Sequence, residues 1–384
     1  MTAYVAQMND KIEPVSLFVD QSDLDDLKDR LTRTRWPAAE TVGDWSQGAP
    51  VGYVREVARY WLDTYDWRAF ETKLNAAGQF RTEIDGVEIG FIHARSPHAH
   101  ALPLLLTHGW PGSIREFTDL VEPLTNPEDP ADAFHVVIPS LPGFGLSGQP
   151  HSTGWTVERI AQAWKVLMAR LGYSRYGAHG GDWGSVVTSN LATVDADHMV
   201  GIHVTIPIVD LDPSATSLEG LSDFERAGAE RVARFGASGM GYFYQQMTAP
   251  QTLGYGLADS PVGQLAWILD KFYNWTDCDG QPDNAISMDA MLDDVMLYWL
   301  NNAATSSARI YWESCPRMPE DVVGIPVGCS IFPFEHVRIP RARTEGRILD
   351  LKYWNELSGG GHFPGLEVPE VLTDELRKFF RLVR

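Results

Sequence analysis

The spacing of apolar residues changes along the chain and predicts several kinds of structure. In residues 20–35 and 51–74, apolar positions recur at helical spacing. Ser22 and Asp25 are placed to form a capping box at the start of the first of these helices. We therefore predict a helical N-terminal extension over residues 1–78.

Beyond this extension, short apolar runs typical of strands alternate with amphipathic runs typical of helices. We expect strands at residues 80–84, 87–93, 102–107, 134–138, 175–180 and 200–206, and helices after residue 113 and at residues 157–171 and 185–193. Asp85-Gly86, between the first two strands, favours a hairpin turn. The alternation predicts an α/β fold, with a mostly parallel sheet flanked by helices.

Residues 207–307 interrupt this alternation with a long run of aromatic, helical sequence. Helices are expected at residues 218–235, 242–247, 265–275 and 288–302. Such a segment is too long to be a simple connection between a strand and the next element. Inserted after a strand, it would cover the ends of the strands as a helical cap. Strands return at residues 326–332 and 348–351, followed by a helix at 372–382, so we assign the α/β core to residues 79–206 and 308–384.

The stretch AHGGDWGSV, residues 178–186, predicts a strand, a tight turn and a helix with Asp182 at the turn. Gly180 and Gly184 provide the small residues that the crowded backbone of a nucleophile elbow needs, at the place where an α/β-hydrolase presents its nucleophile. An aspartate there is ionised at neutral pH and can attack a saturated carbon, leaving an ester that water hydrolyses. The alternative is a glycine turn in which Asp182 only caps the helix.

Hydrolysis of such an ester needs a base, and His362 stands in a glycine-rich loop before the last helix. Glu335 follows the preceding strand and completes the chain order of nucleophile, acid and histidine. Two simpler interpretations are that His362 caps the last helix and that Glu335 pairs with Arg338 on the surface. Asp210 and Asp212, which follow an earlier strand, are rival acids.

The ester and the leaving oxygen need hydrogen-bond donors. The backbone N–H groups of Trp183, directly after the nucleophile, and Trp110, in the loop after residues 102–107, are placed to form an oxyanion hole where the substrate binds. Tyrosine hydroxyls from the cap are suited to donate to the opened oxygen. The candidates are Tyr242, Tyr244, Tyr298 and Tyr311, although tyrosines in aromatic helices are more often core residues.

Composition narrows the classes of partner. The net charge of −20 over 384 residues disfavours nucleic acid, and no apolar run approaches the ~20 residues of a membrane span. The start lacks the pattern of a secretory signal and the three cysteines are widely spaced, so we expect reduced thiols and a cytoplasmic protein. Residues 143–148 match a dinucleotide fingerprint without the helix that must follow it, and we expect neither a nucleotide cofactor nor a metal.

Jointly, several motifs resemble those of the epoxide hydrolase family of α/β-hydrolases, in its microsomal-type branch with a helical N-terminal domain. They include Thr34-Arg35-Trp36-Pro37, His108-Gly109-Trp110-Pro111-Gly112-Ser113, Gly181-Asp182-Trp183-Gly184-Ser185, Ser306-Ser307-x-Arg309-x-Tyr311, Phe332-Pro333-x-Glu335 and Gly360-Gly361-His362-Phe363. The resemblance covers nearly the whole chain. It implies that Asp182 is the nucleophile and that Glu335 and His362 form the charge-relay pair.

The resemblance also implies that Tyr311 and Tyr242 polarise the epoxide, with Tyr244 as the alternative to Tyr242. The expected activity is cofactor-independent addition of water to a small-molecule epoxide, giving a vicinal diol in natural-product biosynthesis or in turnover of foreign epoxides. The membrane anchor of some members is missing, which favours a bacterial-type enzyme without membrane association.

Aromatic residues of the cap favour a bulky apolar epoxide. One rival function is that of a haloalkane dehalogenase, which shares the aspartate but binds halide with indole or amide N–H groups. Another is that of a binding protein that has kept the fold. A homo-oligomer is an option that no pattern in the sequence supports.

Overall fold

The computed structural model describes residues 10–207, 220–315, 322–344 and 346–384, and these form one nine-stranded sheet in the order β1-β2-β3-β5-β4-β6-β7-β8-β9. The strands are β1 (Glu13–Val15), β2 (Gln79–Ile84), β3 (Val87–Ala94), β4 (Leu102–Thr107), β5 (Phe134–Pro139), β6 (Tyr176–Gly180), β7 (Met199–Val204), β8 (Val327–Ile331) and β9 (Leu351–Glu356). From β5 to β9 all neighbours are parallel, whereas β1, β2, β3 and β5 pair antiparallel. The expected α/β-hydrolase fold, with its mostly parallel sheet, is confirmed.

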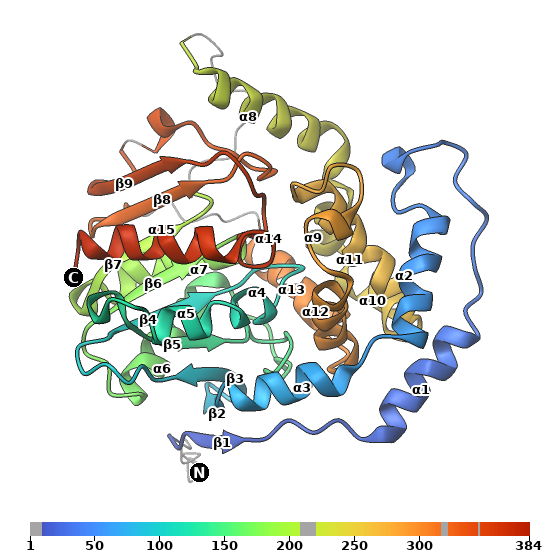
Figure 1. The fold of residues 1–384 in the computed structure, drawn as a ribbon, viewed down its shortest axis with the longest axis horizontal. Coiled ribbons are helices and arrows are strands. Elements are labelled where there is room, and N and C mark those ends of the chain that lie inside the picture. The colour runs from blue at the N-terminus through green and yellow to red at the C-terminus, as the bar shows by residue number, and fades with distance from the viewer. Residues whose placement is uncertain (1–9, 208–219, 316–321, 345) are drawn as a thin grey trace, which may run out of the picture.

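Helices cover both faces of the sheet (Figure 1). They are α4 (Arg115–Thr118), α5 (Val121–Thr125), α6 (Val157–Arg170), α7 (Trp183–Val194), α14 (Pro364–Glu367) and α15 (Pro369–Arg381). The central strands are almost wholly buried, because a parallel sheet covered on both faces leaves neither face to water. Because these strands are parallel, the carboxyl ends of β4, β6, β8 and β9 lie at one common edge of the sheet, where loops can meet.

The helices between β7 and β8 lie beside that edge of the sheet (Figure 1). They are α8 (Asp223–Arg234), α9 (Gly241–Thr248), α10 (Pro250–Asp259), α11 (Pro261–Trp275), α12 (Met288–Leu300) and α13 (Ala304–Ser314). Here α10 is an element that the hydrophobic pattern did not predict. The expected boundary between cap and core, after Ser307, falls inside α13, so the domain limits stay a prediction.

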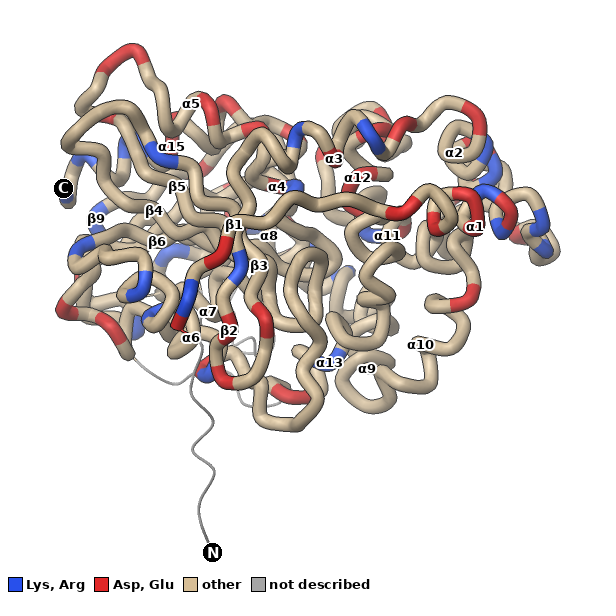
Figure 2. The backbone as a smooth tube through the Cα atoms, turned by 90° about the horizontal axis from the view of Figure 1, so that it is seen from below, with Lys and Arg blue, Asp and Glu red and all other residues tan. Residues whose placement is uncertain are grey.

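The N-terminal segment wraps around the cap instead of forming a separate layer. It contains α1 (Gln21–Thr32), α2 (Val51–Asp63) and α3 (Trp67–Ala76), and Figure 1 shows α1 and α2 along the outer side of α10 and α11. Three of its tyrosines donate hydrogen bonds of 2.8 Å to aspartates of the cap region: Tyr53 to Asp283, Tyr60 to Asp289 and Tyr65 to Asp293. Both acidic and basic residues lie along α1 at the outer edge (Figure 2).

Some sequence expectations were wrong in detail. The capping box is absent, because α1 begins after Asp20 and Asp25 accepts a hydrogen bond from Gln21. The single helix expected after residue 113 is split into α4 and α5, and Pro123, which lacks an N–H, stands where a continuous helix would need a donor. Ile348 forms only an isolated bridge, and the last strand begins at Leu351.

Among the described residues, no helix is both long enough and apolar enough to cross a bilayer.

Candidate active site

Asp182 stands at a strained turn between β6 and α7. Its φ of 50° and ψ of −129° lie outside the regions that a side chain normally allows, which costs on the order of 1–3 kcal/mol. A Cβ on Gly184 would lie 1.9 Å from the Thr107 carbonyl oxygen, and one on Gly180 would lie 2.1 Å from the Gly184 carbonyl oxygen. Only glycine fits these two places, and the Asp182 side chain makes no capping hydrogen bond, so the simple capping interpretation was wrong.

The carboxylate of Asp182 fits against the loop after β4. Its Oδ1 accepts a hydrogen bond of 2.8 Å from the Trp110 backbone N–H. A Cβ on Gly109 would approach Asp182 to 2.3 Å, so a glycine there leaves room for the carboxylate. Burial raises the pKa of Asp182, whereas His362 and the backbone N–H groups of Trp110 and Trp183 act to lower that pKa. The Trp110 N–H thus binds Oδ1 directly, and the Trp183 N–H acts on the same carboxylate.

His362 lies between the carboxylates of Asp182 and Glu335. Its Nε2 is 3.5 Å from Oδ2 of Asp182, and its Nδ1 is 2.9 Å from both oxygens of Glu335. Its backbone N–H donates to the Trp275 carbonyl at 2.8 Å, which ties the loop before α14 to the end of α11. The side chain is therefore engaged with two carboxylates, and the interpretation of His362 as a helix cap was wrong.

Charges determine the protonation of His362. Burial alone would lower its pKa, but the carboxylates of Glu335, Asp182 and Glu116 raise the pKa of His362 to about 9. Burial would raise the pKa of Glu335, yet His362 and His336 hold that pKa below its ordinary value. The two carboxylates thus favour the imidazolium form of His362.

Glu335 is buried, with 1% of its surface exposed, in the loop after β8. It does not pair with Arg338, whose guanidinium donates to the Phe224 carbonyl at 3.0 Å, so the surface-pair interpretation was wrong. The rival acids Asp210 and Asp212 lie outside the described residues.

Two of the four candidate tyrosines lie near Asp182. Tyr242 on α9 is 5% exposed and stacks on Trp110, with ring centroids 5.0 Å apart and planes within 9°. Tyr311 on α13 packs edge-on against Trp183 at 4.9 Å, with its hydroxyl buried near Tyr242. Burial raises the pKa of both tyrosines well above the ordinary value, and the charge of Asp182 acts in the same direction. Both are neutral donors.

The other two tyrosines are placed elsewhere. Tyr244, also on α9, is 56% exposed. Tyr298 on α12 is buried and donates to the Gly112 carbonyl at 2.8 Å, which fixes α12 to the loop after β4. Tyr298 therefore has a structural partner, and Tyr244 faces solvent.

Two residues near the site were missed by sequence reasoning. His336 stacks on Trp275 at 4.2 Å, and its Nδ1 is 2.8 Å from Oε1 of Glu335. Lys271 lies over the ring of Tyr242 at 4.5 Å. The sequence held a signal for each residue. His336 directly follows Glu335, and Lys271 is a charged residue within an apolar helix.

Among the described residues, one cluster has the composition of a metal site: Glu335, His336 and His362. Nδ1 of each histidine lies within 2.9 Å of a Glu335 oxygen. Contacts between Glu335 and the two histidines therefore explain this cluster without a metal. A metal there would displace the contacts that orient His362 toward Asp182.

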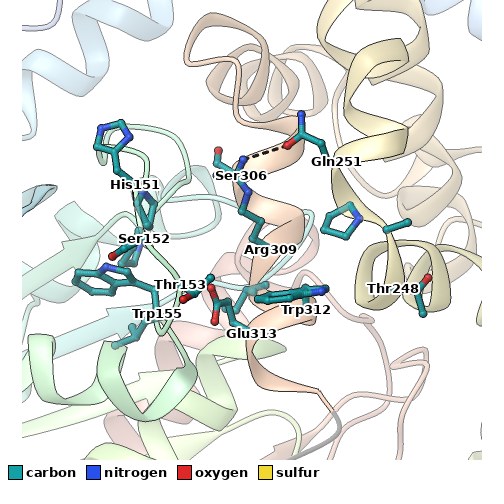
Figure 3. A pocket seen from close by; sticks show the side chains of 16 residues that line it. His151, Ser152, Thr153, Trp155, Thr248, Gln251, Ser306, Arg309, Trp312 and Glu313 are labelled. Carbon is teal, nitrogen blue, oxygen red and sulfur yellow. Dashed lines mark hydrogen bonds between the residues drawn. The ribbon is translucent and has the colours of Figure 1, made fainter.

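A surface pocket of about 570 Å³ lies against α13, on the face of the helix that does not carry Tyr311 (Figure 3). Arg309 and Glu313 of α13 reach into it, and Trp155 lies across from them. Arg309 donates to the Gln251 side chain at 3.3 Å. Tyr311 points away from this pocket toward Trp110 and Trp183, so the pocket is separate from the nucleophile.

Comparisons with known proteins place the chain among epoxide hydrolases. Residues 12–117 match the sequence profile described as "Epoxide hydrolase N terminus", and residues 103–238 match "alpha/beta hydrolase fold". A proposed epoxide hydrolase of Stigmatella aurantiaca (strain DW4/3-1) is 48% identical over 97% of this chain and 86% of that protein. Epoxide hydrolase 1 of Sus scrofa is 31% identical over 98% of this chain and 90% of its own length. The structure of Aspergillus niger epoxide hydrolase has a TM-score of 0.89 at 31% identity, covering 99% of this chain and 98% of that one.

Proposed function

The chain belongs to the epoxide hydrolase family of the α/β-hydrolase fold, and from this premise we propose that Asp182, His362 and Glu335 form its catalytic triad. The reaction adds water to an epoxide and gives a vicinal diol. The observation that carries the residue assignment is the Asp182 carboxylate, bound by the Trp110 N–H at 2.8 Å and lying 3.5 Å from His362.

In the first step Asp182 attacks a ring carbon of the epoxide. Its Oδ1 is held by Trp110, so Oδ2 forms the new C–O bond while the ring C–O bond breaks. Tyr242 and Tyr311, as neutral phenols, donate hydrogen bonds to the oxygen that becomes an alkoxide. The products of this step are an alkyl ester of Asp182 and a β-hydroxyl group.

Ester formation also changes His362. The Asp182 charge is one of those that raise the pKa of His362, and the ester is neutral, so the pKa of His362 falls. The proton that His362 releases balances the proton gained by the ring oxygen. Neutral His362 can then act as a base.

In the second step His362, oriented by Glu335, takes a proton from water, and the oxygen of that water attacks the ester carbonyl carbon. The oxyanion forms where the N–H groups of Trp110 and Trp183 point. The bond from the carbonyl carbon to Oδ2 breaks, and the leaving oxygen takes a proton from His362. The diol leaves, and the remaining acid proton of Asp182 restores the imidazolium.

The wall around Asp182 supports an apolar or aromatic substituent on the epoxide. Trp110, Tyr242 and Tyr311 pack ring to ring, and Phe243 joins Tyr311 at 5.3 Å. Phe272, another aromatic residue of the cap, instead packs against Phe363 and belongs to the core.

We place the enzyme in the cytoplasm, and its cysteines support this proposal. Cys278, Cys315 and Cys329 are all free, as expected in a reducing compartment.

The test is one turnover of excess enzyme with styrene oxide in water enriched in oxygen-18. Label in the peptide that contains Asp182, with unlabelled oxygen in the first diol, is the expected result, because Oδ2 leaves with the product. Diol labelled on the first turnover, with Asp182 unlabelled, would mean direct attack by water. Asp182→Asn serves as the control and should form no ester at the start of the incubation. A parallel incubation with a brominated alkane, in which we expect no halide release, tests the dehalogenase alternative.

A further inference from the structure

Lys271 lies inside the cap, against the ring of a proposed catalytic tyrosine. Its Nζ is 4.5 Å from the ring centroid of Tyr242 and 5.7 Å from the centroids of Trp267 and Trp275. Only 7% of Lys271 is exposed. Trp267, Lys271 and Trp275 follow each other at four-residue spacing, so one face of α11 presents a cation between two indoles.

This position is unusual for a lysine. Lysine side chains normally extend their ammonium group to water, because burial of the charge is costly. Asp270, the adjacent residue, forms an ion pair with Lys271, and the side chain of Asp270 is 24% exposed. That ion pair alone does not require the Lys271 ammonium group to lie over an aromatic ring. The aromatic faces of Tyr242 and its neighbours take the place of the lost water.

The ring of Tyr242 is fixed between this cation and the loop after β4. Trp110 stacks on it with planes within 9°, and Trp110 is also the residue whose N–H binds Asp182. Lys271, Tyr242 and the nucleophile are thus linked through consecutive contacts from α11 to the sheet.

We propose that Lys271 is a positioning residue that acts through Tyr242: its charge strengthens the hydrogen bond that the Tyr242 hydroxyl donates to the opening epoxide oxygen. As that oxygen becomes an alkoxide, the hydroxyl proton of Tyr242 shifts toward it. The phenol oxygen and the ring of Tyr242 then carry more negative charge. A cation over the ring stabilises this change more in the transition state than in the ground state, which lowers the barrier to ester formation.

The charges around Tyr242 explain why such help is useful. Burial is the largest cause that raises the pKa of Tyr242, and the anions Asp182 and Glu335 raise that pKa further, so they weaken the tyrosine as a donor. Lys271 supplies a charge of the opposite sign directly against the ring. The inference rests on the proposed role of Tyr242.

The test measures ester formation and ester hydrolysis separately, in single turnovers of styrene oxide followed by rapid quench and intact-protein mass. Lys271→Met keeps the length of the side chain without the charge, and Lys271→Arg keeps the charge. Both are made in the natural chain and in a Tyr242→Phe background, and thermal unfolding shows that each variant is folded.

We expect Lys271→Met to slow ester formation about tenfold and to leave ester hydrolysis unchanged, with Lys271→Arg restoring most of the rate. In the Tyr242→Phe background Lys271→Met should have no further effect, because the hydroxyl on which the charge acts is gone. An equal loss in both backgrounds, or an equal loss in both steps, would mean that Lys271 only supports packing and would overturn the proposal. If Tyr242→Phe alone leaves ester formation unchanged, the proposed role of the tyrosine fails; if Tyr242→Phe slows it but Lys271→Met does not, only the inference about Lys271 fails.

Discussion

Replacing Glu335 by glutamine should separate the two chemical steps. The carboxylate contacts Nδ1 of His362 with both oxygens at 2.9 Å and is 1% exposed. Glu335→Gln removes the charge with little change in shape. Asp182 and its Trp110 donor are untouched, so we expect ester formation within about threefold of the natural rate.

The expected loss in ester hydrolysis follows from the pKa of His362. The ordinary value is 6.5, and Glu335, first among the charges that raise the pKa, helps to bring it to about 9. At about 1.4 kcal/mol for each pH unit, that increase corresponds to about 3 kcal/mol of preference for the imidazolium. The imidazolium forms as His362 removes a proton from water, so losing most of this preference should slow hydrolysis by roughly 10²-fold.

The assay is rapid quench of the variant with styrene oxide, with the mass of the protein recorded over time. The ester should accumulate to nearly one equivalent and decay about 10²-fold more slowly than in the natural enzyme. Glu356→Gln, at an exposed position at the end of β9, is the control for loss of a carboxylate and should show no accumulation. Turnover of Glu335→Gln at a third of the natural rate or more, without ester, would refute the assignment of Glu335.

Other predictions test the tyrosines, the elbow and a buried histidine. Tyr242→Phe should slow ester formation about 10²-fold, and Tyr244→Phe, at an exposed position, should change it less than twofold; equal effects would contradict their placement. Gly184→Ala should lose more than about 3 kcal/mol in urea unfolding, because its Cβ would lie 1.9 Å from the Thr107 carbonyl oxygen, and an unchanged midpoint would argue against this turn. Burial lowers the pKa of His203 to about 3, so the unfolded chain binds the extra proton, and stability should fall by up to ~1.4 kcal/mol for each pH unit below 6.5. His203→Asn should make the pH dependence less steep by up to that amount between pH 7 and pH 5, and an unaltered slope would show that His203 does not titrate in this way.

The core strands could be predicted because each is a short apolar run that both faces of the sheet bury. The strand expected at residues 102–107 is found as β4 over the same residues. β1 escaped prediction, since three residues have no period to detect and their strand exists only through pairing with β2. β9 begins where the expected strand at 348–351 ends, because polar residues interrupt its apolar ones and none of its residues is fully buried at the edge of the sheet.

The triad candidates were accessible to sequence reasoning because the fold places them in a fixed chain order, each in a loop after a strand. The residues alone favoured Glu335 but left Asp210 and Asp212 as rival acids, since all three follow strands, and the family resemblance implied Glu335. The structure brings Glu335 to His362 by folding β8 beside β9, a contact between residues 27 positions apart. That choice depends on sheet order, which the local pattern does not contain.

The tyrosines show where sequence reasoning ended. Tyr242 and Tyr244 are two positions apart, and two residues of a helix turn by about 200°, so only one of them can face the nucleophile. Which one does so depends on which side of α9 meets Trp110 and α11, and both sides of this helix carry aromatic residues. The same packing brings Lys271 against the chosen ring. Because one contact between helices selects the donor and also places a charge over it, substitutions at the interface of α9 and α11 should affect ester formation before they affect ester hydrolysis.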